Sequence, residues 1–238
     1  MNPSCLLLVL SLFFVIALPA QAQKKKMTVQ NWWENAEKKV ESQNYKSAII
    51  DINKGLALDS THPHLYSLRS LCKGNIEDKK GEYEDLLLAA KYSRTKNDSV
   101  MYRFNLALSN HARKQYDKAV EYYREMLKIM PEYTGGYSAF IMELLYAKRF
   151  EEAEKEAKAL LLMDSDVQTQ FYLQRTLAYA LLFQNRGSQA EEIFTKICRN
   201  IPEGVNIEET LQSDKKDFTE AGLQHHDLAK LYAVAKKQ

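Results

Sequence analysis

The stretch from Phe104 to Pro131, FNLALSNHARKQYDKAVEYYREMLKIMP, decides the fold of this chain. Its apolar side chains recur every three or four residues in two successive blocks, a spacing typical of amphipathic helices. The second block begins at Tyr116 and should end before Pro131, because proline lacks a backbone N–H and collides with the preceding helical turn. The stretch therefore predicts two helices joined by a turn.

The pattern of the second helix recurs along the chain. An aromatic residue stands three positions before a small one, as in Tyr45 and Ala48 or Phe150 and Ala153. The residues that mark five copies are Ala48, Leu86, Ala119, Ala153 and Ala190, with spacings of 38, 33, 34 and 37 residues. This period is the length of one helix–turn–helix unit. Beyond residue 22 the chain has three prolines, Pro63, Pro131 and Pro202, and all three fall between the predicted helix pairs.

These residues resemble the tetratricopeptide-repeat family. The third unit carries the pattern best, with Leu106 and Ala107 in its first helix and Tyr116, Ala119 and Tyr123 in its second. The second unit is degenerate, and we expect about four extra residues near positions 75–80. The resemblance covers residues 29–203. It implies an all-α fold, a right-handed α-α superhelix (solenoid) of about five helix-turn-helix repeats.

The C-terminal residues 204–238 are predicted to form a linker and a capping helix. Positions 203–214 are polar and turn-like, and Asp217 is the expected cap of a last helix over residues 217–236. A repeat array needs its terminal apolar face covered. The residues expected to cover the fifth helix pair are Phe218, Leu228, Leu231 and Tyr232.

Residues 1–22 are predicted to be a signal peptide. An apolar run from Cys5 to Leu18 is followed by Pro19 and by an Ala-Gln-Ala sequence that ends at Ala22. Cleavage there would leave a basic linker, residues 23–28, and an exported protein in the periplasm or on the cell surface. The alternative is an uncleaved membrane anchor, since no Lys or Arg precedes the run and Lys24 to Lys26 follow it.

Composition and motifs argue against catalysis and nucleic-acid binding. The net charge is only +2, with basic residues spread among acidic ones. Phosphate-binding loops and hydrolase or metalloprotease motifs are missing from the sequence. The pairs His62/His64 and His225/His226 have no third ligand at a suitable spacing, and the second pair is expected in a helix where neighbours point apart. We therefore expect no metal, no cofactor and no enzymatic activity.

The resemblance implies that a protein or peptide partner binds the concave face formed by the first helices. The residues that it places there are Trp33, Phe104, Leu108, Met142, Tyr146, Tyr172, Arg175, Tyr179 and Phe183. Five of them, Phe104, Met142, Tyr146, Tyr172 and Tyr179, predict one continuous stripe for apolar anchors of an amphipathic helix or extended peptide. The alternative is that the aromatic residues pack within the array or under the C-terminal helix.

The predicted function is accordingly a non-catalytic protein–protein interaction scaffold in the bacterial cell envelope. The alternative is a membrane-anchored assembly factor or co-chaperone that keeps its N-terminal apolar segment. Among the predicted concave residues Arg175 is the only cation, so the set of cations and amides with which some family members bind a C-terminal carboxylate is missing.

Overall fold

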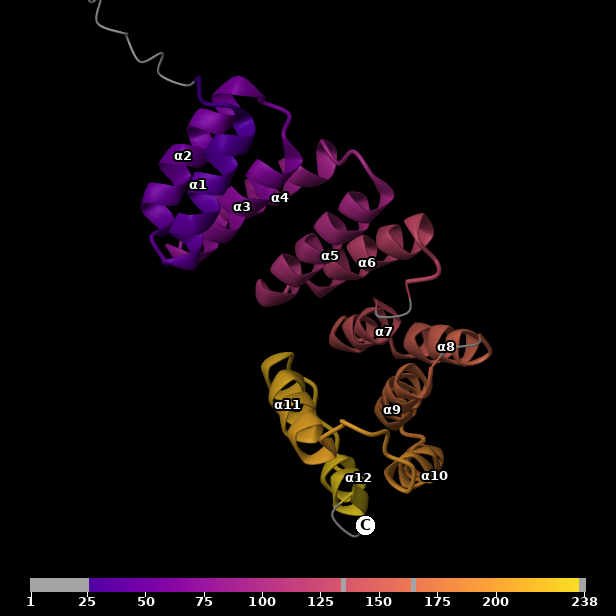
Figure 1. Cartoon of the computed structure of the whole chain (residues 1–238). Helices are drawn as coiled ribbons and strands as arrows, with labels where there is room; N and C mark the ends of the chain where they lie inside the picture. Colours follow the sequence, from indigo (N-terminus) through magenta and orange to yellow (C-terminus); the bar gives the residue numbers. More distant parts are fainter. Residues whose placement is uncertain (1–25, 134–135, 164–165, 236–238) are drawn as a thin grey trace, which may run out of the picture.

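The computed structural model describes residues 26–133, 136–163 and 166–235, and the regular secondary structure of these residues is entirely helical. Ten helices form five antiparallel pairs that follow one another along a curve (Figure 1). The pairs are α1 (Val29–Glu41) with α2 (Tyr45–Leu58), α3 (Pro63–Asn75) with α4 (Lys79–Lys91), α5 (Lys96–Ala112) with α6 (Tyr116–Ile129), α7 (Tyr137–Tyr146) with α8 (Phe150–Leu161), and α9 (Val167–Phe183) with α10 (Gly187–Cys198). The predicted all-α repeat architecture is confirmed.

Each pair is joined by the same tight turn. The turn contains one residue with a left-handed backbone, with φ between 57° and 66° in Gln43, Glu77, Lys114, Lys148 and Asn185. The next backbone N–H then donates to a carbonyl five residues earlier, as from Gln115 to Asn110 at 2.9 Å. Because these five turns are equivalent, they set the register of the repeats. Their spacings are 77 − 43 = 34, 114 − 77 = 37, 148 − 114 = 34 and 185 − 148 = 37 residues.

The second pair corrects one expectation. Its turn at Glu77 has the same geometry as the others, so the extra residues expected near positions 75–80 are not there. The marker expected at Leu86 lies one helical turn, four residues, beyond the position in α4 that is equivalent to Ala48 in α2. The residue equivalent to the alanine markers is Glu82, three positions into α4.

The core divides into two clusters of buried apolar residues. The marker alanines of the other four pairs are fully buried, which lets the two helices of each pair approach closely. The smaller cluster joins α1, α2 and α3 through Ala36, Ala48, Ile52, Leu56, Leu65 and Cys72. The larger cluster runs from α5 to α12. Cys72 and Cys198 are buried free thiols and lie three repeats apart.

Two helices follow the array where one was predicted. Helix α11 (Ile207–Glu220) begins after Asn206, whose side chain accepts a hydrogen bond from the Glu209 N–H, and α12 (Leu228–Ala235) follows a loop. The expectation of a turn over 203–214 is wrong because the polar residues there cover one side of an amphipathic helix. Its other side buries Leu211, Asp214 and Phe218.

The two C-terminal helices pack in different places. Helix α12 packs on α10, while α11 turns back along the side of the array formed by α7 and α9 (Figure 1). The expected contacts Phe218 and Leu231 are buried, and Leu228 and Tyr232 pack partly against the same core.

The predicted signal peptide, its alternative as an anchor and most of the basic linker lie outside the described residues. None of the helices that the structure describes has both the length and the apolar character to cross a bilayer.

Candidate functional site

The first helices of the pairs present equivalent side chains to one surface. The positions that lie ten and six residues before each left-handed turn residue are occupied by Trp33 and Glu37, Ser67 and Leu71, Phe104 and Leu108, Ser138 and Met142, and Arg175 and Tyr179. This register agrees with the one predicted for the concave face. The surface nevertheless differs between its two halves.

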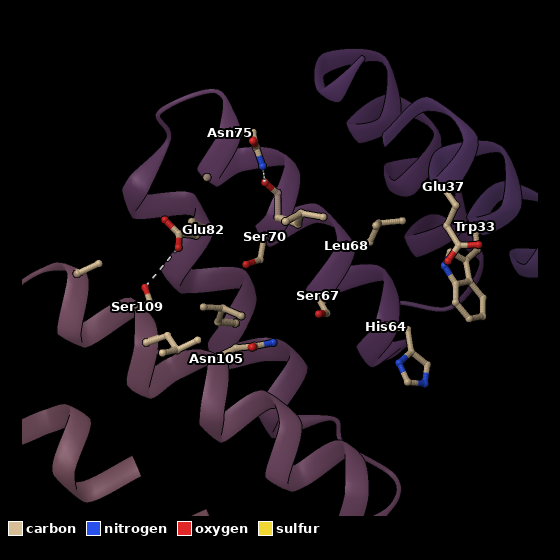
Figure 2. Close-up of a pocket in the computed structure, with 15 residues that line it drawn as sticks. Trp33, Glu37, His64, Ser67, Leu68, Ser70, Asn75, Glu82, Asn105 and Ser109 are labelled. Atoms are coloured by element: carbon tan, nitrogen blue, oxygen red, sulfur yellow. Dashed lines mark hydrogen bonds between the residues drawn. The ribbon is translucent and has the colours of Figure 1, made fainter. Parts of the chain in front are cut away.

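The N-terminal half of this surface is an open groove. It has a volume of about 620 Å³ and lies between α1, α3 and α5, with the beginning of α4 at one end (Figure 2). Leu71 and Leu108 are apolar yet 50% and 45% exposed in it. The other lining residues are Trp33, Glu37, His64, Ser67, Leu68, Ser70, Gly74, Asn75, Glu82, Leu86, Asn105, Ser109 and Ala112. The groove therefore offers apolar contact area that the described residues leave uncovered.

Aromatic contacts hold one end of the groove. The rings of Trp33 and His64 stack with centroids 5.7 Å apart and an interplanar angle of 12°. His64 Nδ1 is 2.8 Å from the hydroxyl of Tyr102, a fully buried side chain of α5. The hydrogen bond ties α3 to α5, and the stacking ties α1 to α3. This end is consequently a preformed wall.

The C-terminal half of the surface is filled by α11. Phe218 of α11 is fully buried, and its ring centroid lies 5.8 Å from that of Tyr146, 4.9 Å from Tyr179 and 5.3 Å from Phe183. Met142 is buried on the same face. The expected continuous open stripe across the third to fifth pairs is therefore wrong, and the alternative of packing under the C-terminal helix is confirmed for these aromatic residues.

A buried polar cluster fixes α11 against α9. The Asp214 carboxylate accepts a hydrogen bond of 2.8 Å from the Tyr179 hydroxyl and lies 3.3 Å from the guanidinium of Arg175. Burial raises the pKa of Asp214, while Arg175 and Tyr179 act in the opposite direction. Arg175 also lies over the ring of Tyr172, at 5.1 Å. The one cation predicted on the concave face is thus paired within the chain.

A second polar pair lies between α5 and α7, where the buried Glu143 meets the partly exposed His111. His111 Nδ1 is 3.0 Å from a carboxylate oxygen of Glu143, and the His111 ring packs edge-on against Tyr146. The hydrogen bond to Glu143 raises the pKa of His111, with further contributions from Asp217 and Glu220 of α11. Burial raises the pKa of Glu143.

The predicted site residues thus separate into three groups. Trp33 and Leu108 line the open groove, and Phe104 is half-buried against the Tyr123 ring at 5.9 Å. The remaining ones, Met142, Tyr146, Tyr172, Arg175, Tyr179 and Phe183, lie in the half filled by α11 or beside it. Glu82 was missed because the second unit was aligned four residues too late. A step of 34 residues from Ala48, the period of the family, leads directly to it.

His225, His226 and Asp227 form the one group of three potential metal ligands within the described residues. They lie in the loop before α12, so the expectation that the two histidines sit in a helix is wrong. His225 Nδ1 accepts from the Asp227 N–H at 3.2 Å, and His225 Nε2 is 3.3 Å from the Asn185 side-chain oxygen. Both ring nitrogens therefore already have partners within the loop packing.

Comparisons with known proteins agree with this architecture. Residues 100–133 match the family model of the tetratricopeptide repeat, and the sequence matches no curated protein. Among solved structures, MamA AMB-1 aligns at 17% identity and a TM-score of 0.56 over 77% of this chain and 96% of its own. YrrB, described as a TPR protein with an unusual peptide-binding site, aligns at 16% identity and 0.58 over 73% and 87%. MamA from Desulfovibrio magneticus RS-1 aligns at 12% identity and 0.59 over 72% and 93%.

These identities are low, so the likeness to the solved structures concerns the fold, while the family model matches the third helix pair itself. Five helix pairs with equivalent turns extend the same architecture over the rest of the array. Residues 100–133 therefore form a tetratricopeptide repeat, and the described array has the fold of tetratricopeptide-repeat proteins.

Proposed function

We propose that this protein is a non-catalytic scaffold that binds a helix or extended segment of a partner protein in the groove between α1, α3 and α5. Proteins of this repeat type are protein–protein interaction modules. The observation that carries the proposal is the groove itself, which has a volume of about 620 Å³, lies on the inner face of three successive repeats and leaves the apolar side chains of Leu71 and Leu108 exposed. An exposed apolar surface of this kind favours a ligand that covers it.

The filled half of the same surface supports this proposal. There, α11 presents Leu211, Asp214 and Phe218, spaced three and four residues apart, to the equivalent face of α7 and α9. Amphipathic helices bind grooves in other proteins through the same spacing of anchors. The chain thus already holds one amphipathic helix on the surface that continues from the open groove.

Paired substitutions test the groove. Leu71→Ser with Leu108→Ser removes two exposed anchors, and each should cost roughly 1–3 kcal/mol of binding free energy if it contacts the partner. The measurement is the affinity of the purified protein for a partner identified by affinity capture from the native cell envelope. Ile50→Ser with Leu58→Ser is the matched control, because these α2 residues are 56% and 53% exposed and do not line the groove. Equal affinities of the two double variants would place the binding site elsewhere.

We propose further that the protein is exported and works in the periplasm or on the cell surface of a bacterium. The support is the apolar run that ends before Pro19 and the Ala-Gln-Ala sequence that follows it. N-terminal sequencing of the protein from its native cell should begin at Gln23. A chain that still begins at Met1 in the membrane fraction would instead support the membrane-anchored assembly factor.

A further inference from the structure

The second helix pair departs from the other four at the position where helices approach most closely. Ala48, Ala119, Ala153 and Ala190 are fully buried three residues into the second helix of their pairs. In α4 this position is occupied by Glu82, a long charged side chain. A helix pair can accept such a side chain only if space is made in the facing helix.

Gly74 of α3 makes that space. The equivalent residues, eight positions before the marker in the other pairs, are Val40, His111, Leu145 and Leu182. A Cβ atom added at Gly74 would lie 3.4 Å from Cδ of Glu82, so the Glu82 side chain packs directly over this glycine and would have to move to admit a larger residue. In the other pairs the first helix carries the larger residue of this contact and the second helix carries alanine. In the second pair the small residue, Gly74, lies on α3 and the large one, Glu82, lies on α4. The exchange places the Glu82 carboxylate at the end of the open groove (Figure 2).

The neighbours of Glu82 leave part of its hydrogen-bonding capacity unused. The Ser109 hydroxyl lies 3.5 Å from one carboxylate oxygen, while Lys79 and Arg113 each lie 3.9 Å from the other. These distances are long for charge-assisted hydrogen bonds. Lys79 also donates to the Gly74 carbonyl at 3.4 Å, and the Arg113 guanidinium donates to the Lys79 carbonyl and lies over the Tyr83 ring. Both cations are therefore shared with other acceptors.

The charge of the groove differs in sign from that of the whole chain. The chain has a net charge of +2, yet the charged residues that line the groove are Glu37 and Glu82, with no Lys or Arg among the lining residues. Leu71 and Leu108 lie in the same groove. Lys79 and Arg113 lie beside Glu82 but also donate to other acceptors, so the two lining carboxylates favour a cationic ligand over a carboxylate.

We propose that the groove selects partner segments in which a lysine or arginine stands close to an apolar anchor. Glu82 receives the basic side chain, and the anchor packs against Leu71 and Leu108. This inference rests on the proposed function, and it names the chemistry of the partner that the same groove accepts.

Selection from a displayed library of random peptides tests the inference with the purified protein. Peptides enriched by the natural protein should carry Lys or Arg near an aromatic or aliphatic residue. Glu82→Gln keeps the shape of the side chain and removes its charge, so it should bind these peptides about five- to tenfold more weakly and lose the preference for basic residues. Gly74→Leu with Glu82→Ala, which restores the arrangement of the fifth pair, should have the same effect if the glutamine variant misfolds.

The outcomes separate this inference from the proposed function. Peptides that lose affinity for Leu71→Ser with Leu108→Ser but bind Glu82→Gln unchanged would overturn the role of Glu82 and leave the groove as the binding site. Enrichment of acidic or wholly apolar peptides would overturn it in the same way. Equal binding to the leucine double variant and the natural protein, or no enrichment at all, would overturn both proposals.

Discussion

At the scale of single residues, the ion pair of Arg175 and Asp214 is the contact on which the stability of the filled half of the array depends most. Both side chains are buried, and the Arg175 Nε has no hydrogen-bond partner. A charge left alone in such a place is costly, because neither water nor a counter-ion compensates it.

Asp214→Ala should therefore lower the free energy of unfolding by roughly 3–5 kcal/mol, as expected when one partner of a buried ion pair is removed. Urea unfolding at neutral pH measures the change. The double variant Arg175→Met with Asp214→Leu should recover most of the loss, since apolar residues of similar volume replace both charges. If Asp214→Ala is as stable as the natural protein, Arg175 has another way to reach solvent and the pair does not hold α11.

His111 predicts how stability depends on pH. Its hydrogen bond to Glu143 raises its pKa above the ordinary value of 6.5, so the folded protein binds the proton more tightly than the unfolded chain. The resulting stabilisation is fully present below pH 6.5 and is lost as the pH rises through the raised pKa of the folded protein. The melting temperature of the natural protein should fall over that range, and the melting temperature of His111→Gln should fall less. Parallel curves for the two proteins would contradict this linkage.

At the scale of elements, α11 acts as a ligand that belongs to the chain. It is amphipathic, it packs on the inner face of α7 and α9 through Phe218, and the loop after it contains Gly222 with a left-handed φ of 67°. Its removal would expose the aromatic side chains of Tyr146, Tyr179 and Phe183, and their contact with water is unfavourable.

Phe218→Ala should detach α11 or destabilise the protein by roughly 3–5 kcal/mol, the usual cost of deleting a buried aromatic ring. Hydrogen exchange should then show faster exchange of the amides of residues 207–220, and a dye that binds apolar surfaces should bind more strongly. Lys216→Ala is the control on the exposed face of the same helix. Unchanged exchange in Phe218→Ala would show that the polar contacts of Asp214 hold the helix by themselves.

At the scale of the whole molecule, the two core clusters are unequal. Within the described residues the cluster of α1 to α3 contains six buried apolar residues, whereas that of α5 to α12 contains 31. Stability in a repeat array is approximately a sum of the repeats and their interfaces. The half that carries the open groove therefore has fewer buried contacts to support it.

We predict that the amides of α1 and α2 exchange with solvent faster than those of α7 and α9, because local opening follows the density of buried contacts. Hydrogen exchange followed by mass spectrometry measures both regions in one experiment. A peptide bound in the groove should slow exchange in α1 and α3 more than in α9, since binding stabilises the folded state of the region it contacts. Uniform protection along the array would indicate a single cooperative unit instead.

The sequence by itself determined that the array consists of helix pairs, and its prolines determined where the first and third pairs end. The spacing of apolar residues, the marker alanines and the prolines Pro63 and Pro131 act within one or two helical turns, so they are legible without a structure. The register of the concave positions followed from the resemblance to the tetratricopeptide repeat that these residues carry. The second unit was misread because it has Glu82 where the other units have their marker alanine. The compensating Gly74 lies on the other helix of the pair, so the spacing of apolar residues along the sequence does not reveal it.

Only the tertiary structure decided which half of the concave face is open. The residues that fill the other half, Leu211, Asp214 and Phe218, stand in a stretch whose exposed side is polar enough to look like a linker. Their partners Arg175 and Tyr179 are 35 or more residues away in the sequence, and local patterns do not encode where a terminal helix docks. Aromatic residues on the first helix of a pair look the same in the sequence whether a partner or the chain's own helix covers them, because both environments favour apolar side chains.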